Sequence, residues 1–400
     1  MYPFHSILYV TTLSLASIAS ATSGTPLEDL RPRSPAPYSD FNNNVVFRPD
    51  SDYTSWKTIY PRSLQLGDGS LLLSWENYPP EPPQAHFPIW KSTDGGATWS
   101  DFVNVTDQAN DWGLRCQPLL YLLPQDFGGY SAGTILLAGM SLPADLSEAW
   151  LDLYASTDDG RNWEFVSHVV YAPGPETVKN GDKAVWEPFL LMYNNQLILY
   201  YSDQRDPAHA QKLSHVITDD LKTWSDPVDD VAVATYGTRP GMATVAYIET
   251  TGKYIMTYEY CDGNNGCAAH YKVADSPLLF GDAANTAIVA DGINPGGSPY
   301  VIWTKDPSGG GSGIIIMNGA SREEVFVNSD DAASDGWKLV DVGQWSAYSR
   351  CLEIIDSNGK SKLMLSNAGN MASGADNYVV VGVVDVPSLV YHRFHEWHMT

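Results

Sequence analysis

The chain has 400 residues, 44% of them hydrophobic, and its 47 acidic and 23 basic residues give a formal charge of -24. A chain of this length buries a large core, and it exceeds the usual size of one simple domain unless the domain is built from repeats. Nucleic acid and anionic membranes are poor partners for it, because binding phosphate groups requires clustered Lys and Arg. A neutral ligand is the better expectation.

The N-terminus resembles a secretory signal. Residues 7–21 are an apolar run rich in Leu, Ser and Ala that ends at Ala19-Ser20-Ala21, the small-x-small form of a signal peptidase site. We therefore predict a signal peptide over residues 1–21, an N-terminal segment over 22–43, a single domain over 44–400, and a secreted protein. No later segment has eighteen uninterrupted apolar residues, so the mature protein is expected to stay off the membrane.

Strand-like segments of Val, Ile, Leu, Tyr and Thr, separated by Gly, Asn and Asp turns, run from about residue 44 to residue 391. Pairs of these segments form six hairpins, each made of an apolar strand, a turn and a second apolar strand. The hairpins cover residues 61–75, 114–140, 185–201, 244–260, 300–317 and 351–365. Their spacing is about the length of one propeller blade.

A second repeat consists of Asp-rich turns that end in Trp, at residues 92–99, 156–163 and 218–224, with a degraded copy at 328–337. The tryptophans Trp99, Trp163 and Trp224 are 64 and 61 residues apart. Both repeats predict an all-β fold, a six-bladed propeller of four-stranded antiparallel blades whose Asp-rich turns link the outer strands. A pair of β-sandwiches is the alternative, and it would leave the regular period to chance.

In such a propeller the innermost strand starts, and the second strand ends, on the face where ligands usually bind. The Asp-rich turns then lie on the opposite face and are structural. Residues at these strand ends should form a polar ring around the axis. The inner strands start near Arg62, Arg115, Glu187, Arg239, Ser298, Tyr348 and Arg350. The second strands end near Glu76, Asp203, Glu259, Asn318 and Asn367.

Two glutamates of the ring have apolar neighbours, in Trp186-Glu187-Pro188 and Tyr258-Glu259-Tyr260. Burial among aromatic residues raises the pKa of a carboxyl, which suits a general acid, while a second, ionised carboxylate can act as a nucleophile. Glycoside hydrolysis uses such a pair. The alternative is that each glutamate forms a structural ion pair with an Arg. Glu76 and Asp203 are reserve candidates. The sequence shows no metal-ligand spacing, phosphate loop or nucleophilic Ser motif, so we expect neither metal nor cofactor.

Four cysteines suit an exported protein of this size. Cys261 and Cys267 bracket a flexible loop and are expected to form a disulfide. Cys116 and Cys351 each lie in an apolar strand, where they are either buried free thiols or a second bond. Asn104-Val105-Thr106 is a glycosylation acceptor if the chain passes through a eukaryotic secretory route.

The Asp-rich turns and six blades resemble the sialidase superfamily. Within it the chain looks most like the fungal exo-arabinanases of glycoside hydrolase family 93. The stretches that carry this resemblance are Val185-Trp186-Glu187-Pro188, residues 200–207, residues 239–242 and Tyr258-Glu259-Tyr260. The resemblance implies a retaining hydrolase that takes arabinan or arabino-oligosaccharides and releases arabinobiose from the non-reducing end of linear α-1,5-arabinan. We expect the enzyme to be a monomer.

The resemblance places Glu187 and Glu259 as the two catalytic glutamates and Tyr348 as a supporting tyrosine. It does not decide which glutamate has which role; we expect Glu187 to be the nucleophile and Glu259, which lies between two tyrosines, to be the acid/base. The ring residues expected to position substrate or the glutamates are Arg62, Arg115, Asp203, Arg239 and Arg350, with stacking surfaces at Trp75 and Trp186.

Two other functions stay open from the sequence. A true sialidase would use a Tyr nucleophile, such as Tyr348, and three arginines that clamp the substrate carboxylate. A sugar-binding propeller without catalysis would carry several equivalent pockets, one per blade, whereas the ring residues differ between blades.

Overall fold

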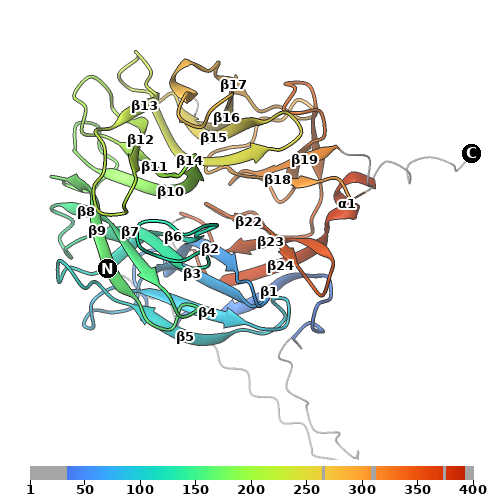
Figure 1. Ribbon diagram of the computed structural model, residues 1–400, viewed down its shortest axis with the longest axis horizontal. Helices are drawn as coiled ribbons and strands as arrows, with labels where there is room; N and C mark the ends of the chain where they lie inside the picture. Colours follow the sequence, from blue (N-terminus) through green and yellow to red (C-terminus); the bar gives the residue numbers. More distant parts are fainter. Residues whose placement is uncertain (1–33, 264–265, 308–311, 373–374, 392–400) are drawn as a thin grey trace, which may run out of the picture. The chain divides into compact units, whose positions relative to one another are not determined.

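The computed structural model describes residues 34–391, apart from 264–265, 308–311 and 373–374. The predicted signal peptide at 1–21 and most of the segment at 22–43 lie outside the described residues. In the described part, 24 strands form six four-stranded antiparallel sheets. The predicted fold class, a six-bladed β-propeller, is confirmed, and Figure 1 shows the sheets arranged as blades around one centre.

The first five blades follow one another along the chain, and each is built from the inside outward. Blade 1 is β2 (Thr58–Gln65), β3 (Leu71–Asn77), β4 (Phe87–Ser92) and β5 (Ser100–Val105). Blade 2 is β6 (Leu114–Leu122), β7 (Ile135–Ser141), β8 (Ala149–Ser156) and β9 (Glu164–Ala172). Blade 3 is β10 (Val185–Tyr193), β11 (Gln196–Asp203), β12 (Lys212–Thr218) and β13 (Val228–Val231). Blade 4 is β14 (Arg239–Ile248), β15 (Lys253–Cys261), β16 (Cys267–Ala274) and β17 (Thr286–Ala287). Blade 5 is β18 (Tyr300–Lys305), β19 (Gly313–Asn318), β20 (Val325–Asn328) and β21 (Trp337–Val340).

Blade 6 closes the ring by joining both ends of the described chain. It consists of β22 (Cys351–Asp356), β23 (Ser361–Asn367), β24 (Val379–Asp385) and, as its outermost strand, β1 (Phe41–Phe47). β1 pairs with β24 through Phe41↔Val383 and Phe47↔Val379, and the two lie side by side in Figure 1. The strand begins at Phe41, slightly before the expected boundary at residue 44. The inner strands β2, β6, β10, β14, β18 and β22 contact one another in turn, and β22 contacts β2 again.

Two short helices complete the described elements, the 3₁₀ helix η1 (Phe280–Asp282) and α1 (Val386–Tyr391). No helix in the described ranges is long and apolar enough to cross a membrane. Hydrophobic clusters fill the spaces between neighbouring blades; one of them packs Leu136 and Leu151 of blade 2 against Leu197 and Leu199 of blade 3. This packing fixes the blades to one another and so sets the positions of the inner strand ends.

The Asp-rich turns link the third and fourth strands of blades 1, 2, 3 and 5, as predicted. In the first copy the Asp94 carboxylate accepts hydrogen bonds from the Ser92 hydroxyl and the Thr98 backbone N–H. The Trp99 indole N–H donates to the carbonyl of Gly96 at 2.9 Å. The second copy repeats these bonds at Asp158 and Trp163. These bonds hold the carboxylates within the turns.

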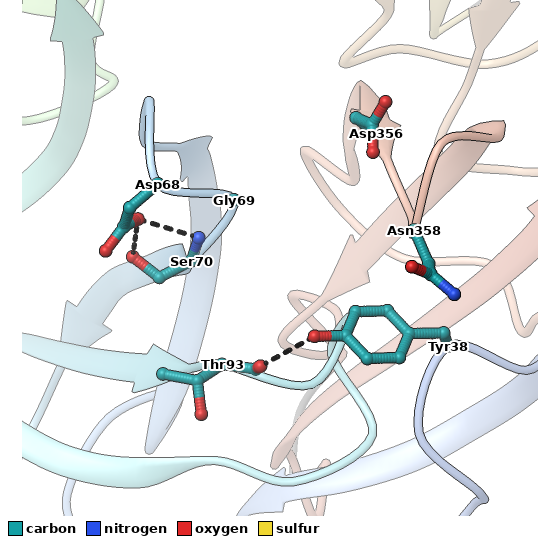
Figure 2. Close-up of a pocket in the computed structure, with 7 residues that line it drawn as sticks. All are labelled: Tyr38, Asp68, Gly69, Ser70, Thr93, Asp356 and Asn358. Carbon is teal, nitrogen blue, oxygen red and sulfur yellow. Dashed lines mark hydrogen bonds between the residues drawn. The ribbon is translucent and has the colours of Figure 1, made fainter.

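A small pocket shows which face these turns occupy. Figure 2 shows Asp68, in the turn between β2 and β3, and Asn358, in the turn between β22 and β23, around one pocket with Thr93 of an Asp-rich turn. The Tyr38 hydroxyl donates to the Thr93 carbonyl there at 3.0 Å. The inner hairpin turns and the Asp-rich turns therefore share a face. The opposite ends of the inner strands, with the polar ring, lie on the other face.

Candidate active site

Near the start of every inner strand, a non-glycine residue at an equivalent position lies in the left-handed backbone region. These six residues are Tyr60, Gln117, Glu187, Met242, Ser298 and Ser349, with φ between 38° and 66°. In β2, β6, β10 and β14 the strand pairing is interrupted at the same place. Such conformations cost about 1–3 kcal/mol each and persist only where surrounding contacts enforce them, most often at functional sites. Their recurrence around the axis marks this ring as the candidate site.

Five of these six backbone N–H groups donate to a side chain of the preceding blade. The bonds run from Gln117 to Glu76 Oε1 (2.9 Å), Glu187 to Gln117 Oε1 (3.0 Å), Met242 to Glu187 Oε2 (2.7 Å), Ser298 to Glu259 Oε2 (3.0 Å) and Ser349 to Ser298 Oγ (3.1 Å). The left-handed backbone thus turns one N–H of each blade toward its neighbour. The carboxyls of Glu76, Glu187 and Glu259 accept three of these five bonds.

Glu187 lies at the start of β10 and is 8% exposed. Its Oε2 accepts two hydrogen bonds of 2.7 Å, one from the Ser202 hydroxyl and one from the Met242 N–H. Ser202 pairs with Trp186 across β10 and β11, so the sheet itself delivers this hydroxyl. Two short hydrogen bonds to one oxygen favour the ionised form of a buried carboxyl.

Glu259 lies near the end of β15 and is half-buried, so it is more accessible to solvent than Glu187. One backbone N–H, from Ser298, bonds its Oε2. The predicted disulfide between Cys261 and Cys267 is present, and its sulfur atoms lie within 4.8 Å of a Glu259 carboxylate oxygen. Because both sulfurs are in the disulfide, this group does not form a thiolate metal site. Cys116 and Cys351 are free thiols, which answers the question that the sequence left open.

The two glutamates face each other across Gly241. A methyl group added at Gly241 would lie 3.3 Å from Glu259 Oε1 and 3.4 Å from Glu187 Oε2. These two distances limit the separation of the oxygens to about 6.7 Å, below most of the roughly 6.5–9.5 Å range of inverting glycosidases and compatible with the roughly 5–5.5 Å of retaining ones. Gly241 therefore leaves open the space in which a sugar can meet both carboxyls.

Burial raises the pKa of both carboxyls, and the charge of Glu259 raises the pKa of Glu187 further. Near neutral pH the pair therefore holds a proton that isolated glutamates would have lost. One carboxylic acid and one carboxylate are the two forms that glycoside hydrolysis requires.

Tyr348 and Arg239 border the pair. Burial, then the carboxyls of Glu259 and Glu187, raise the pKa of Tyr348 far above its usual value, so its phenol stays a hydrogen-bond donor. Arg239 donates to Gln211 Oε1 at 2.7 Å and to Asn180 Oδ1 at 2.9 Å. Its positive charge acts on both glutamates. The structure thus brings together the predicted Glu187, Glu259, Tyr348 and Arg239.

Three other predicted residues are occupied by structural hydrogen bonds. Arg62 donates to the carbonyl of Ser349 at 3.1 Å and to its hydroxyl at 3.0 Å, joining blades 1 and 6. Arg350 is 1% exposed, and the carbonyls of Glu323, Gln344, Trp345 and Glu324 accept its guanidinium hydrogens. Asp203 forms a two-point ion pair with Arg205. Arg62, Asp203 and Arg350 are thus held by hydrogen bonds within the protein, and their contact with substrate stays a prediction.

Trp75, predicted as a stacking surface, has no exposed face in this structure. Its indole is fully buried, stacks on Phe47 at 5.3 Å, and packs with Leu73 and Val381 between blades 1 and 6. The sequence places Trp75 directly before Glu76, and side chains alternate between faces along a strand, so only one of the two can point toward the ring. Trp186 is half-buried, and its indole nitrogen has no hydrogen-bond partner among the described residues.

Arg115 forms an ion pair with Glu81. Since Arg62 and Arg350 are held by backbone carbonyls as well, the four described ring arginines do not include three unpaired ones that could clamp a substrate carboxylate. Asn104 is exposed on β5, and its glycosylation stays a prediction.

The sequence interpretation missed Gln117, Ser202 and Gly241. The sequence did point to their neighbourhood, since each lies within two residues of a predicted ring position. Their roles depend on strand pairing and on the left-handed backbone, which a single sequence does not display.

Known proteins of similar structure share the fold of this chain. Neither a protein-family model nor a curated protein matches the chain. Among solved structures, an α-L-arabinofuranosidase of family 93 from Fusarium graminearum, in complex with arabinobiose, is 44% identical. The match covers 88% of this chain and 99% of that one, with a TM-score of 0.84. The chain belongs to glycoside hydrolase family 93.

A second member of the comparison, an α-L-arabinanase of Penicillium chrysogenum complexed with arabinobiose, is 41% identical over 87% of this chain and 98% of that one, with a TM-score of 0.82. A sialidase from Streptococcus pneumoniae is 10% identical, with a TM-score of 0.58 over 87% of this chain and 71% of that one. The sialidase match shows a shared propeller fold alone. The resemblance to family 93 that the sequence motifs indicated is confirmed.

Proposed function

We propose that this protein is a secreted, retaining exo-glycosidase that hydrolyses linear α-1,5-L-arabinan from the non-reducing end and releases arabinobiose. Family membership supports the reaction class, and two of the similar structures hold arabinobiose, which supports the substrate. The observation that carries the proposal is the pair formed by Glu187 and Glu259, which face each other across Gly241.

Glu187 is the nucleophile in this proposal. Its carboxylate attacks the anomeric carbon of the arabinofuranosyl residue, forms a covalent ester with the enzyme, and displaces the leaving sugar. The two hydrogen bonds to Oε2 stabilise the negative charge and leave the other oxygen to react. Its low exposure keeps water from competing for it.

Glu259 is the general acid and base. In the first step its carboxyl protonates the glycosidic oxygen as the bond to the anomeric carbon breaks. In the second step the resulting carboxylate takes a proton from the water that attacks the ester, and the anomeric configuration is retained. The greater solvent exposure of Glu259 suits this role, because it must admit that water and exchange its proton.

Tyr348 and Arg239 are proposed to support the charges that change during the reaction. The Tyr348 phenol lies within electrostatic range of both glutamates, and no hydrogen bond joins its hydroxyl to another described residue. It can therefore donate to a nucleophile or substrate oxygen. Arg239 favours the ionised form of either glutamate.

The first experiment is product analysis of the purified protein with linear α-1,5-arabinan and, separately, with a sialoside. Arabinobiose as the initial product, with the retained anomer seen by NMR before mutarotation, supports the proposal. Release of sialic acid, or of an inverted product, contradicts it.

The second experiment assigns the two roles by azide rescue with an aryl arabinoside whose leaving group needs no acid. In Glu259→Ala the enzyme ester still forms, and azide replaces water to give an arabinosyl azide of retained configuration. In Glu187→Ala azide occupies the place of the nucleophile and gives the inverted configuration. The opposite pattern would exchange the roles of the two glutamates.

A further inference from the structure

A chain of hydrogen bonds connects Glu187 to a third buried carboxyl. The Glu187 backbone N–H donates to Gln117 Oε1 at 3.0 Å, and the Gln117 backbone N–H donates to Glu76 Oε1 at 2.9 Å. Glu76 lies near the end of β3, Gln117 in β6 and Glu187 in β10, so the chain spans the inner edges of three blades. Gln117 is 8% exposed and Glu76 is 4% exposed.

Gln117 and Glu187, whose N–H groups donate the two bonds of this chain, are both held in an unfavourable backbone conformation. Gln117 has φ 57° and Glu187 has φ 66°. A left-handed residue of these types keeps its conformation only if neighbouring groups stabilise it, and here the bond that each N–H donates is such a contact. Without the Gln117 side chain, the buried N–H of Glu187 would lose its acceptor and the backbone could relax.

Such a relaxation would move the carboxylate of Glu187. Its position is determined by the backbone at residue 187 and by the bonds from Ser202 and Met242, which come from β11 and β14. A small misplacement lengthens both bonds and misaligns the attack on the anomeric carbon, which strongly reduces the rate.

Glu76 is itself fixed at both oxygens. Oε1 accepts from Gln117, and Oε2 accepts from the Tyr78 hydroxyl at 2.6 Å. Burial raises the pKa of Glu76 to about 7, against the hydrogen bonds from Tyr78 and Gln117. Since both of its oxygens are already in hydrogen bonds within the protein, the carboxyl is placed to hold the backbone of Gln117 and not to react.

We propose that Gln117 and Glu76 are positioning residues for the nucleophile, with Gln117 holding the backbone of Glu187 and Glu76 holding the backbone of Gln117. This inference rests on the proposed function, because it concerns the reaction that Glu187 carries out. It assigns to the reserve candidate Glu76 a role that acts through another residue.

The test compares two buried glutamines changed in the same way. Gln117→Leu keeps the size of the side chain and removes the acceptor. Gln344→Leu is the matched control, since Gln344 is 1% exposed and donates to the Leu365 carbonyl at 2.8 Å, away from the glutamate pair. For each variant kcat and KM on arabinotriose, the pH profile of kcat, and the melting temperature are measured.

Gln117→Leu is expected to lower kcat by ten-fold or more with KM changed less than three-fold, and to move the acidic limb of the kcat profile to higher pH. The limb moves because weaker bonds from Ser202 and Met242 stabilise the ionised nucleophile less. Gln344→Leu is expected to lower the melting temperature without moving that limb. Gln117→Glu, which keeps an acceptor oxygen, should recover part of the kcat.

Glu76 is tested through a double-mutant comparison. Glu76→Gln should lower kcat several-fold, and the double variant with Gln117→Leu should be no slower than Gln117→Leu alone, because both act along one chain. If Gln117→Leu does not fold, Glu76→Gln, which keeps the shape of the side chain, carries the kcat and pH-limb test. Wild-type kcat and an unmoved acidic limb in these folded variants would overturn the proposal.

Different results would disprove the proposed function and this inference. If the wild-type protein releases no arabinobiose, or if Glu187→Gln stays active, the function is wrong. If the wild type is active and Glu187→Gln is inactive while both Gln117→Leu and Glu76→Gln behave like wild type, only the positioning role is wrong.

Discussion

The Ser202 hydroxyl donates a 2.7 Å hydrogen bond to Glu187 Oε2. The two residues belong to adjacent strands of blade 3, and Glu187 is one of the six left-handed residues near the starts of the inner strands. Through this bond, the pairing of two strands places a donor that stabilises the negative charge of the proposed nucleophile. The first prediction concerns this bond.

Ser202→Ala should lower kcat by about ten-fold, because a hydrogen bond to a charged group is worth about 1.5–3 kcal/mol and the Met242 N–H still supplies one. The pKa of Glu187 should rise, which moves the acidic limb of the pH–rate profile upward. Ser214→Ala is the control, since Ser214 is also buried in blade 3 but bonds Asp229. An unchanged kcat and limb in Ser202→Ala would remove this bond from the catalytic machinery.

Gly241→Ala should lower kcat strongly with a small change in stability. The added methyl group would stand 3.3 Å and 3.4 Å from the two glutamate oxygens and 2.7 Å from Gln211 Nε2, in the space that the sugar needs. Gly241 does not have a positive φ, so backbone strain does not explain a loss. Gly67→Ala, at a turn glycine with an open surrounding, is the comparison. Steady-state kinetics measure the activity of both variants, and thermal melts measure their stability. Equal activity in the two variants would contradict this account.

Stability should fall as pH rises from about 5 to 8. Burial raises the pKa of Glu187 and Glu259, and it raises that of Glu353 to about 7, so the folded state binds more protons than the unfolded chain in this range. For a raised carboxyl pKa, the stability is present below the unfolded pKa and is lost as pH rises through the folded value. Melting temperatures measured across this range check the slope.

Glu187→Gln should therefore melt higher than the wild type at pH 8 while being inactive. The amide keeps an acceptor for Ser202 and Met242 and carries no charge to repel Glu259. At pH 4, where the wild-type carboxyl is protonated, the two melting temperatures should converge. A lower melting temperature for the variant at pH 8 would show that the ionised form is favoured by the fold.

Trp75→Ala and Trp186→Ala should separate a core role from a site role. Trp75→Ala creates a cavity between blades 1 and 6 and should cost about 3–5 kcal/mol of stability, with KM unchanged for the folded protein. Trp186→Ala, at a half-buried indole beside Glu187, should raise KM for arabino-oligosaccharides and leave the melting temperature nearly unchanged. Denaturant titration and kinetics together measure both effects, and the reverse pattern would place the substrate at Trp75.

Much of the fold followed from local patterns. The Asp-rich turns depend on bonds within a few residues, such as that from Thr98 to Asp94, so their sequence signal is complete in itself. Strand alternation and the regular period then determined six blades of four strands. The closing of the ring by β1 was not visible, because it pairs Phe41 with Val383 at the far end of the chain.

The candidate site divides in the same way. The apolar neighbours of Glu187 and Glu259, together with the blade period, sufficed to place both carboxyls at one end of the axis. The same reasoning assigned Arg62, Arg350, Asp203 and Trp75 to the substrate. The structure shows hydrogen bonds within the protein at the first three and a buried indole at Trp75, none of which a strand position indicates. Position along a strand shows which face of the propeller a residue is near, but hydrogen bonds to other blades decide whether its polar groups remain free.

What the sequence by itself determined was the repeat, the blade count, the disulfide and the two glutamates, since each is encoded in short segments and their spacing. Only the tertiary structure decided that Gln117, Ser202 and Met242 hold those glutamates. The reason is physical: five left-handed backbone N–H groups each reach an acceptor in the preceding blade, and that geometry exists only when consecutive blades are packed side by side.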